Sequence, residues 1–426
     1  MSKITIGENR ISFEKDGKPF FYFADTMWSA FTNVTDQEWG YYLKKRAEQG
    51  FNVLQMNILP QWDRCWVPSA YAPFPSKDGN RFDYAGGFVQ EYFDHARDFC
   101  KKAVEKGFVP ALVVLWSNYV PGTWASKANP HNMIPEELIV PYCKKVAETF
   151  DEFEPIYIIS GDTDLESEES IRYYETALAE MKRLSPDTLK TAHIKGRYTY
   201  LTEGLAEGLD FYVFQSGHNN GYPEKPYSMP QEFREKYPLK PLINAEPCYE
   251  QISYSGGMYG RFDTHAIRRA AWMSVLSGAN AGIAYGAHGV WNWQKTGMPF
   301  NPNVGEGFDE AKVWEEALNF PGAWDYSYLK YLLEELDVST LQPDTRVISR
   351  TSDIRMATSG DGRISLVYIP HNTKVCIQEN LSGARVYAVE LSTRYHAVPE
   401  VSIGEDETTT IGMCSFDRDV LLVIRR

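Results

Sequence analysis

Residues 156–162 read Ile-Tyr-Ile-Ile-Ser-Gly-Asp, and residues 242–246 read Leu-Ile-Asn-Ala-Glu. Both are short apolar runs, which is typical of buried strands in a parallel sheet. The first run ends on Asp162 and the second on Glu246. These segments are therefore predicted to be buried strands that present a carboxylate at their carboxyl ends.

Similar apolar runs lie on both sides of these segments and alternate with periodic stretches that fit amphipathic helices. One such helix is opened by the capping-box sequence Thr35-Asp36-Gln37-Glu38. A doubly wound sheet fits less well, because a glycine-rich turn should follow the first strand, and residues 24–28 read Ala-Asp-Thr-Met-Trp. We therefore predict a (β/α)8 TIM barrel. Its eight strands are expected at residues 20–24, 52–58, 109–116, 156–162, 191–194, 211–216, 242–246 and 282–286.

The pattern changes after a helical connection that we expect over residues 311–336. Short alternating runs at 364–369, 384–389 and 420–424 are separated by turn residues such as those at 359–362. This pattern predicts a small antiparallel β-sandwich. We therefore expect a catalytic barrel domain at residues 1–335 and a sandwich domain at residues 336–426.

Composition narrows the classes of partner. The chain has 43 Lys and Arg against 57 Asp and Glu, a formal charge of −14, and no basic stripe, so neither nucleic acid nor an anionic membrane surface is expected. No secretory signal and no long apolar span can be found. The six cysteines lack the paired spacing of a disulfide framework or a zinc cluster. Together these features predict a cytoplasmic protein.

The two carboxylates are the candidate catalytic groups. Strands four and seven of an eight-strand ring lie nearly opposite each other, and catalytic groups of such barrels gather at the carboxyl ends of strands. Glycoside hydrolysis with retention needs two carboxyl groups about 5–5.5 Å apart. Either acid alone could equally cap a helix or pair with an arginine. Their joint placement favours Asp162 as acid/base and Glu246 as nucleophile.

Other strand ends carry polar and aromatic side chains that form a predicted substrate-binding set. Aromatic rings can stack on sugars, although each ring could instead fill the barrel mouth. Trp62 and Trp66 are further candidates for stacking on a sugar. Three histidines raise the alternative of a metal-dependent hydrolase, but neither His-x-His after the first strand nor His-Glu-x-x-His occurs, so no metal or other cofactor is expected. The predicted set is Asp25, Trp28, Asn57, Trp116, His193, Gln215, His218, Tyr249, Glu250, Tyr285, His288 and Trp291.

Several of these stretches resemble the apiosidase-like glycoside hydrolases (glycoside hydrolase family 140 and its relatives), a branch of the barrel clan that includes the cellulase-type enzymes. The resemblance implies a retaining, exo-acting hydrolase with the strand-four Asp as acid/base, the strand-seven Glu as nucleophile and a C-terminal β-sandwich. The similar stretches are Ala24-Asp25-Thr26-Met27-Trp28, residues 46–53 (RAEQGFNV), Ser160-Gly161-Asp162, residues 244–250 (NAEPCYE), residues 285–291 (YGAHGVW) and the connection at 314–323.

The sequence also departs from that pattern. The family more often has Gly where Ala24, Ser160 and Ala245 stand, and the wider clan usually has Asn in the place of Gly161. Because this Asn is missing, another residue must form the hydrogen bond with the 2-hydroxyl group of the sugar. We therefore expect the substrate to be a small glycoside or oligosaccharide that is cleaved from one end. Specificity for apiose is not inferred from the resemblance. A non-catalytic carbohydrate-binding barrel is the main alternative, and assembly as a homo-oligomer is left open.

Overall fold

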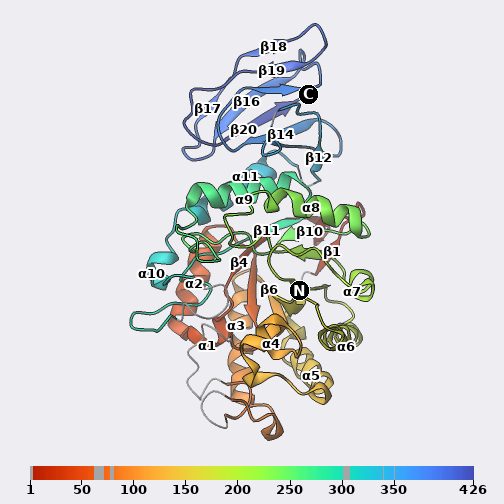
Figure 1. The fold of residues 1–426 in the computed structure, drawn as a ribbon, viewed down its shortest axis with the longest axis vertical. Helices are drawn as coiled ribbons and strands as arrows, with labels where there is room; N and C mark the ends of the chain where they lie inside the picture. The colour runs from red at the N-terminus through yellow and green to blue at the C-terminus, as the bar shows by residue number, and fades with distance from the viewer. Residues whose placement is uncertain (1–2, 62–71, 77–80, 301–307, 339, 350) are drawn as a thin grey trace.

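The barrel consists of eight parallel strands, and their hydrogen-bonded order is β8-β7-β6-β5-β4-β11-β10-β9. The computed structural model describes residues 3–61, 72–76, 81–300, 308–338, 340–349 and 351–426 (Figure 1). Each strand lies within or beside a predicted one, which confirms the predicted fold class. The strands are β4 (Tyr22–Thr26), β5 (Val53–Asn57), β6 (Val109–Trp116), β7 (Ile156–Gly161), β8 (Lys190–Thr191), β9 (Tyr212–Phe214), β10 (Leu242–Asn244) and β11 (Gly282–Tyr285).

The sheet closes between β8 and β9 through backbone hydrogen bonds outside the paired strands. The amide of Asp210 donates to the carbonyl of Lys190 (2.9 Å), and the amide of Arg197 donates to the carbonyl of Gln215 (2.7 Å). These two bonds link the edge strands, so that the ring is nearly closed. The residues that follow each strand are therefore gathered around one mouth.

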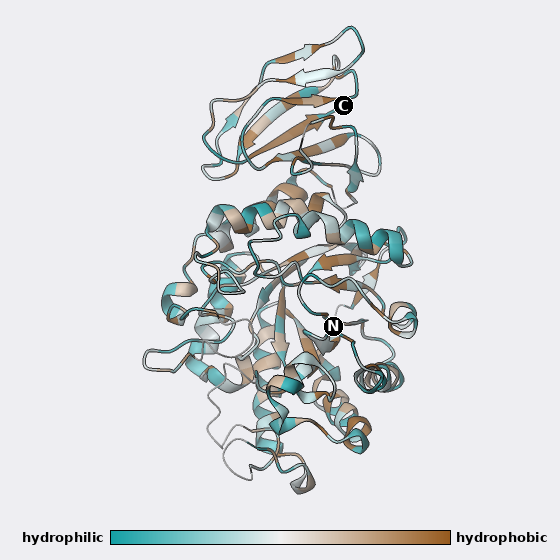
Figure 2. Cartoon of the chain, in the orientation of Figure 1, coloured by the Kyte–Doolittle hydropathy of each residue, from teal (hydrophilic) through white to brown (hydrophobic). Residues whose placement is uncertain are grey.

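A helix follows each strand and packs outside the ring. Thr35 and Glu38 form the predicted capping box at the start of the first helix. The segments that became α7 and α8 were not predicted as helices, and α8 contains Pro230 in its interior. Figure 2 shows apolar residues concentrated in the barrel strands and polar residues on the outer helices. The helices are α2 (Asp36–Glu48), α3 (Gln90–Glu105), α5 (Ile139–Phe150), α6 (Glu168–Leu184), α7 (Glu203–Gly208), α8 (Lys225–Lys236), α9 (Thr264–Leu276) and α11 (Gly322–Glu335).

A three-stranded antiparallel sheet precedes the barrel and was not predicted. It contains β1 (Ile4–Ile6), β2 (Phe13–Lys15) and β3 (Lys18–Phe20). Asp16 and Gly17 both have positive φ, as a tight hairpin turn requires. Phe13 packs edge-on against Phe211 with ring centroids 5.1 Å apart. Because Phe211 lies at the amino end of β9, this sheet covers the barrel end opposite the mouth.

The C-terminal part contains two antiparallel sheets that enclose a core of their own, as the sequence predicts (Figure 1). Helix α11 ends at Glu335, and the expected division of the chain at residues 335 and 336 stays a prediction. No helix among the residues placed by the structure is long and apolar enough to cross a membrane. The larger sheet contains β12 (Gln342–Asp344), β13 (Arg355–Thr358), β14 (Ile364–Ile369), β20 (Val420–Arg425), β16 (Arg385–Glu390) and β17 (His396–Ala397); the smaller contains β15 (Val375–Ile377), β19 (Thr409–Ile411) and β18 (Val401–Ile403).

The sandwich is joined to the barrel by both apolar and ionic contacts. The barrel core continues into the larger sheet through residues such as Leu366 and Leu421. Arg268 on α9 forms buried ion pairs with Asp325 on α11 (2.8 Å) and with Asp419 beside β20 (2.6 Å). The residues that join the two parts are therefore buried.

Candidate active site

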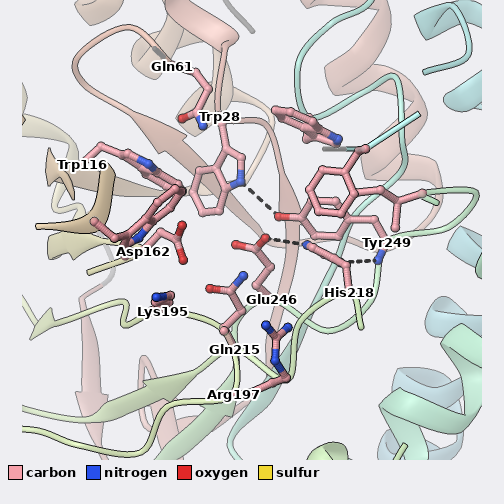
Figure 3. Close-up of a pocket in the computed structure, with 15 residues that line it drawn as sticks. Trp28, Gln61, Trp116, Asp162, Lys195, Arg197, Gln215, His218, Glu246 and Tyr249 are labelled. Carbon is pink, nitrogen blue, oxygen red and sulfur yellow. Dashed lines mark hydrogen bonds and ion pairs between the residues drawn. The ribbon is translucent and has the colours of Figure 1, made fainter. Parts of the chain in front are cut away.

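The mouth of the barrel holds a cavity of about 380 Å³. Side chains from the ends of most strands reach it, and both predicted catalytic carboxylates are among them (Figure 3). The cavity is lined by Trp28, Gln61, Trp116, Trp124, Asp162, Lys195, Gly196, Arg197, Gln215, His218, Glu246, Tyr249, Ile252, Trp291 and Phe308.

Glu246 lies two residues beyond β10 and is held between two histidines. Its Oε1 is 2.8 Å from Nε2 of His218, and its Oε2 is 3.2 Å from Nε2 of His193. Burial alone would raise the pKa of Glu246, but the contacts with His193 and His218 outweigh it and lower the pKa to about 2. The Glu246 side chain is therefore an ionised carboxylate at neutral pH, although its exposed fraction is only 6%.

Backbone hydrogen bonds fix the tautomers of the two histidines. Nδ1 of His193 accepts from the amide of Asp162 (3.2 Å), and Nδ1 of His218 accepts from the amide of Tyr249 (3.4 Å). A neutral imidazole with an accepting Nδ1 carries its proton on Nε2. His218 therefore directs its Nε2–H at Oε1 of Glu246, whereas Nε2 of His193 lies 3.2 Å from Oε2 in a close contact that lacks the alignment of a hydrogen bond.

Asp162 is the first residue after β7, and its carboxylate points into the same cavity as Glu246 (Figure 3). Its φ is +50°, which is uncommon for a residue with a side chain. Its carbonyl accepts a hydrogen bond from the indole N–H of Trp124 (2.8 Å). The backbone at Asp162 is thus held in a left-handed conformation from both its amide and its carbonyl side.

Gly161 is required by the ring of Trp116. The two residues are paired across β6 and β7, and a Cβ on Gly161 would lie only 2.2 Å from Cε3 of Trp116. The ring therefore occupies the space in which a side chain at position 161 would begin. With Trp116 in this position, an Asn at position 161 would collide with the ring.

Two further indole rings in the cavity are fixed by hydrogen bonds of their N–H groups. Trp28 donates to the hydroxyl of Tyr249 (3.1 Å), and Trp291 donates to Nδ1 of His288 (3.2 Å). Trp28 also packs edge-on against Trp116, with ring centroids 5.2 Å apart. Rings held in this way present preorganised apolar faces of the kind on which sugars stack.

The structure brings together about half of the predicted substrate-binding set. His193 contacts Glu246 from behind and is fully buried. Trp62 and Trp66 lie outside the residues that the structure describes. The predicted residues that line the cavity are Trp28, Trp116, Gln215, His218, Tyr249 and Trp291.

Five predicted substrate-binding residues require correction, because the structure places them in buried contacts away from the cavity. Asp25 pairs with Arg46 (2.6 Å) and accepts from Tyr42 (2.7 Å), and Asp25 and Arg46 are both 0% exposed. Asn57 donates to Gln61, which lines the cavity in its place.

The other three corrected residues support the mouth from outside. Glu250 accepts from the hydroxyl of Tyr285 (2.6 Å) and from the amide of Gly322 (2.9 Å). His288 contacts the carbonyl of Asp309 (2.8 Å) through Nε2 and holds Trp291 through Nδ1. Glu250, Tyr285 and His288 therefore fix loops around the cavity instead of facing it.

The predicted set also missed residues that line the cavity. Gln61 and Lys195 follow strands closely enough to be found from the sequence. Trp124 begins the short helix α4 (Trp124–Ala128), and Arg197 and Phe308 lie outside helices and strands, so no sequence pattern marks these three residues. The ammonium of Lys195 lies 5.8 Å from the ring of Trp124. Among the described residues, no group of three or more His, Cys, Asp and Glu side chains is placed to hold a metal ion.

Comparisons with known proteins bear on the family and the fold of the chain. A family model described as "Apiosidase-like, catalytic domain" matches residues 7–340. The fold is similar to that of a protein described as a glycoside hydrolase (TM-score 0.78, 21% identity, 99% of this chain and 96% of that one) and of a glycoside hydrolase family 5 protein from Bacteroides vulgatus (TM-score 0.78, 23% identity, 99% and 93%).

A family 5 mannosidase from Rhizomucor miehei is a more distant structural relative (TM-score 0.54, 13% identity, 79% of this chain and 100% of that one). A search of curated proteins finds no match. The family model nevertheless covers most of the chain, including both carboxylates and every strand of the barrel. The chain belongs to the apiosidase-like family and is a glycoside hydrolase of the (β/α)8 fold.

Proposed function

We propose that this protein is a retaining, exo-acting glycosidase that removes a terminal sugar from small glycosides or oligosaccharides by double displacement. Glu246 attacks the anomeric carbon while Asp162 protonates the leaving oxygen, which gives a covalent glycosyl-enzyme. Asp162 then takes a proton from a water molecule, and this water displaces Glu246. The sugar is released with its original anomeric configuration.

The observation that carries the proposal is the state of Glu246. A carboxylate that attacks carbon must be ionised and free of a permanent cationic partner on its reacting face. The hydrogen-bonding and electrostatic effects of His193 and His218 lower the pKa of Glu246 to about 2, against the effect of its burial. Asp162 differs in its surroundings, since it lies one residue past a strand and is only half-buried. Carboxyl groups in unlike environments suit the unlike roles of nucleophile and acid.

The size of the cavity supports action on one end of a small substrate. Its volume of about 380 Å³ is near the lower end of the roughly 300–1,000 Å³ that is usual for ligand sites. Four indole rings line the cavity, and Trp28 and Trp116 lie on the same side of it in Figure 3. Such a site fits one or two sugar rings better than a long chain.

A screen of aryl glycosides, including pentosides and apiosides, tests the proposal. NMR of the first product formed should show retained configuration. Glu246→Gln should abolish turnover and still bind substrate. Asp162→Ala should lose roughly 10²–10⁴-fold in kcat/KM on substrates with poor leaving groups and far less on activated aryl glycosides, which need little protonation.

Three results would contradict the proposal. A product with inverted anomeric configuration would show that Glu246 is not the nucleophile. Equal losses on both substrate types for Asp162→Ala would remove its role as the acid. Sugar binding without turnover of any glycoside would instead indicate a carbohydrate-binding barrel.

A further inference from the structure

His193 contacts both candidate catalytic residues, one with each ring nitrogen. Nδ1 accepts from the backbone amide of Asp162 (3.2 Å), and Nε2 lies 3.2 Å from Oε2 of Glu246. The other histidine at the site, His218, contacts Glu246 but has its Nδ1 on the amide of Tyr249. Among the described contacts, His193 alone joins the backbone of one carboxylate residue to the side chain of the other.

The ring of His193 is held firmly enough to transmit this geometry. Its own backbone is tied to Ser160, two residues before Asp162, by an amide-to-carbonyl bond (3.2 Å) and by a bond from the Ser160 hydroxyl to the His193 carbonyl (2.9 Å). Trp28 and Trp116 pack against the imidazole with ring centroids 5.9 and 6.1 Å away. The side chain is 0% exposed, so it is shielded from substrate.

Asp162 needs such support, because its φ of +50° is costly for a residue with a side chain. A left-handed residue at the end of a strand persists only where its neighbours determine it. The acceptor at Nδ1 of His193 is one of the groups that does so. Moving this acceptor would let the amide of Asp162 rotate and would turn its carboxylate relative to Glu246.

We propose that His193 is a positioning residue that fixes the carboxylate of Asp162 and the carboxylate of Glu246 relative to each other, through one ring nitrogen for each. The inference rests on the proposed roles of these two residues. It assigns separate tasks to the two nitrogens. Nδ1 aligns the acid, and Nε2 orients the nucleophile.

The two tasks can be separated by substitution, because Asn and Gln each replace one ring nitrogen. His193→Asn places an amide oxygen near the position of Nδ1 but does not reach Glu246. His193→Gln places an amide N–H near the position of Nε2 but has no acceptor for the amide of Asp162. His218→Gln is the matched control, since it removes an acceptor from the amide of Tyr249 instead.

Leaving-group dependence is the readout. His193→Gln should behave as a misaligned acid, with about a 100-fold loss in kcat/KM on poor leaving groups and less than about tenfold on activated aryl glycosides. His193→Asn should lose similar factors on both substrate classes, because its defect lies at the nucleophile. His218→Gln should show no dependence on the leaving group. Equal profiles for His193→Asn and His193→Gln would overturn the inference.

A second measurement needs no substrate. In protein labelled with ¹⁵N-histidine, the ring of His193 should show a proton on Nε2 and a bare Nδ1 at neutral pH, with the signals assigned by their loss in His193→Gln. A proton on Nδ1 would refute the proposed contact with Asp162. If Glu246→Gln retains full turnover, the proposed function itself fails. If Glu246→Gln is inactive but both His193 variants behave alike, only the positioning role fails.

Discussion

Gly161→Ala is a substitution whose effect can be worked out directly from atomic positions. The added Cβ would lie 2.2 Å from Cε3, 2.7 Å from Cδ2 and 2.9 Å from Cζ3 of Trp116. Carbon atoms in contact are about 3.5 Å or more apart, so the ring must retreat by about 1.3 Å or the two strands must separate. The φ of Gly161 lies outside the left-handed region, so the backbone itself would tolerate alanine.

Two effects should follow. Overpacking of this kind costs about 1–3 kcal/mol in the free energy of unfolding. Trp116 lines the cavity and Gly161 immediately precedes Asp162. Since a displacement of about 1 Å in an active site can cost about 10²-fold in rate, kcat/KM should fall by a similar factor.

Urea unfolding would measure the loss of stability, and steady-state kinetics on an aryl glycoside that the enzyme hydrolyses would measure the loss of activity. The control is the same substitution in a Trp116→Ala background, where the added methyl group meets no ring. The free-energy cost of Gly161→Ala should then largely disappear, which gives a coupling of about 1 kcal/mol or more in the double-mutant cycle. An equal cost in both backgrounds would refute the reasoning, because the strain would not come from the ring.

Two further predictions concern charge. The folded-state pKa of Glu246 is about 2, below its ordinary value of 4.5. Ionised Glu246 therefore stabilises the folded state by about 3 kcal/mol above pH 4.5. This contribution is lost as the pH falls from 4.5 toward 2. Urea unfolding across that window should therefore show a smaller loss of stability for Glu246→Gln than for the wild type, and parallel curves would contradict this. Arg268→Met should destabilise the protein by about 3–5 kcal/mol, because it leaves Asp419 buried and unpaired. Arg394→Met, on the more exposed pair with Asp325, should cost less than about 1 kcal/mol. Equal costs for the two substitutions would show that the burial of the Arg268 ion pairs does not decide their contribution.

The fold was predictable because the barrel repeats one signal. Each buried strand is an apolar run and each outer helix a periodic one, so errors at single boundaries do not change the number of strands. The elements that were missed lack that signal. The N-terminal hairpin consists of three-residue strands, and its clearest mark is the turn at Asp16-Gly17. Helix α7 has six residues, and α8 carries proline in its interior.

The site was predictable in part, since strand order alone places Asp162 and Glu246 at one mouth. Direct contact with the cavity depends on the direction of each side chain and on long loops. Trp124 reaches the cavity from the start of the short helix α4 and Phe308 from a loop, and the positions of both depend on tertiary packing. His193 was expected to contact substrate, but it lies one layer deeper and contacts Glu246.

Asp25 shows which feature of the sequence separates a structural carboxylate from one that faces the cavity. Asp25 is still paired within β4, so the pleat fixes its direction, and it points outward to the helix layer. Asp162 and Glu246 lie beyond the last residues of β7 and β10, where the chain has left the pleat and can turn into the mouth.

The partner of Asp25 is also readable from the sequence of α2. Its buried positions are Trp39, Tyr42, Leu43 and Arg46, which have the i, i+3, i+4, i+7 spacing of a core-facing stripe. An arginine at a core position must meet a buried anion, because an unpaired charge there would be prohibitively costly. Asp25 on the adjacent strand is that anion. A carboxylate inside a strand, opposite an arginine in the apolar stripe of the next helix, is therefore better interpreted as part of the scaffold than as part of the site.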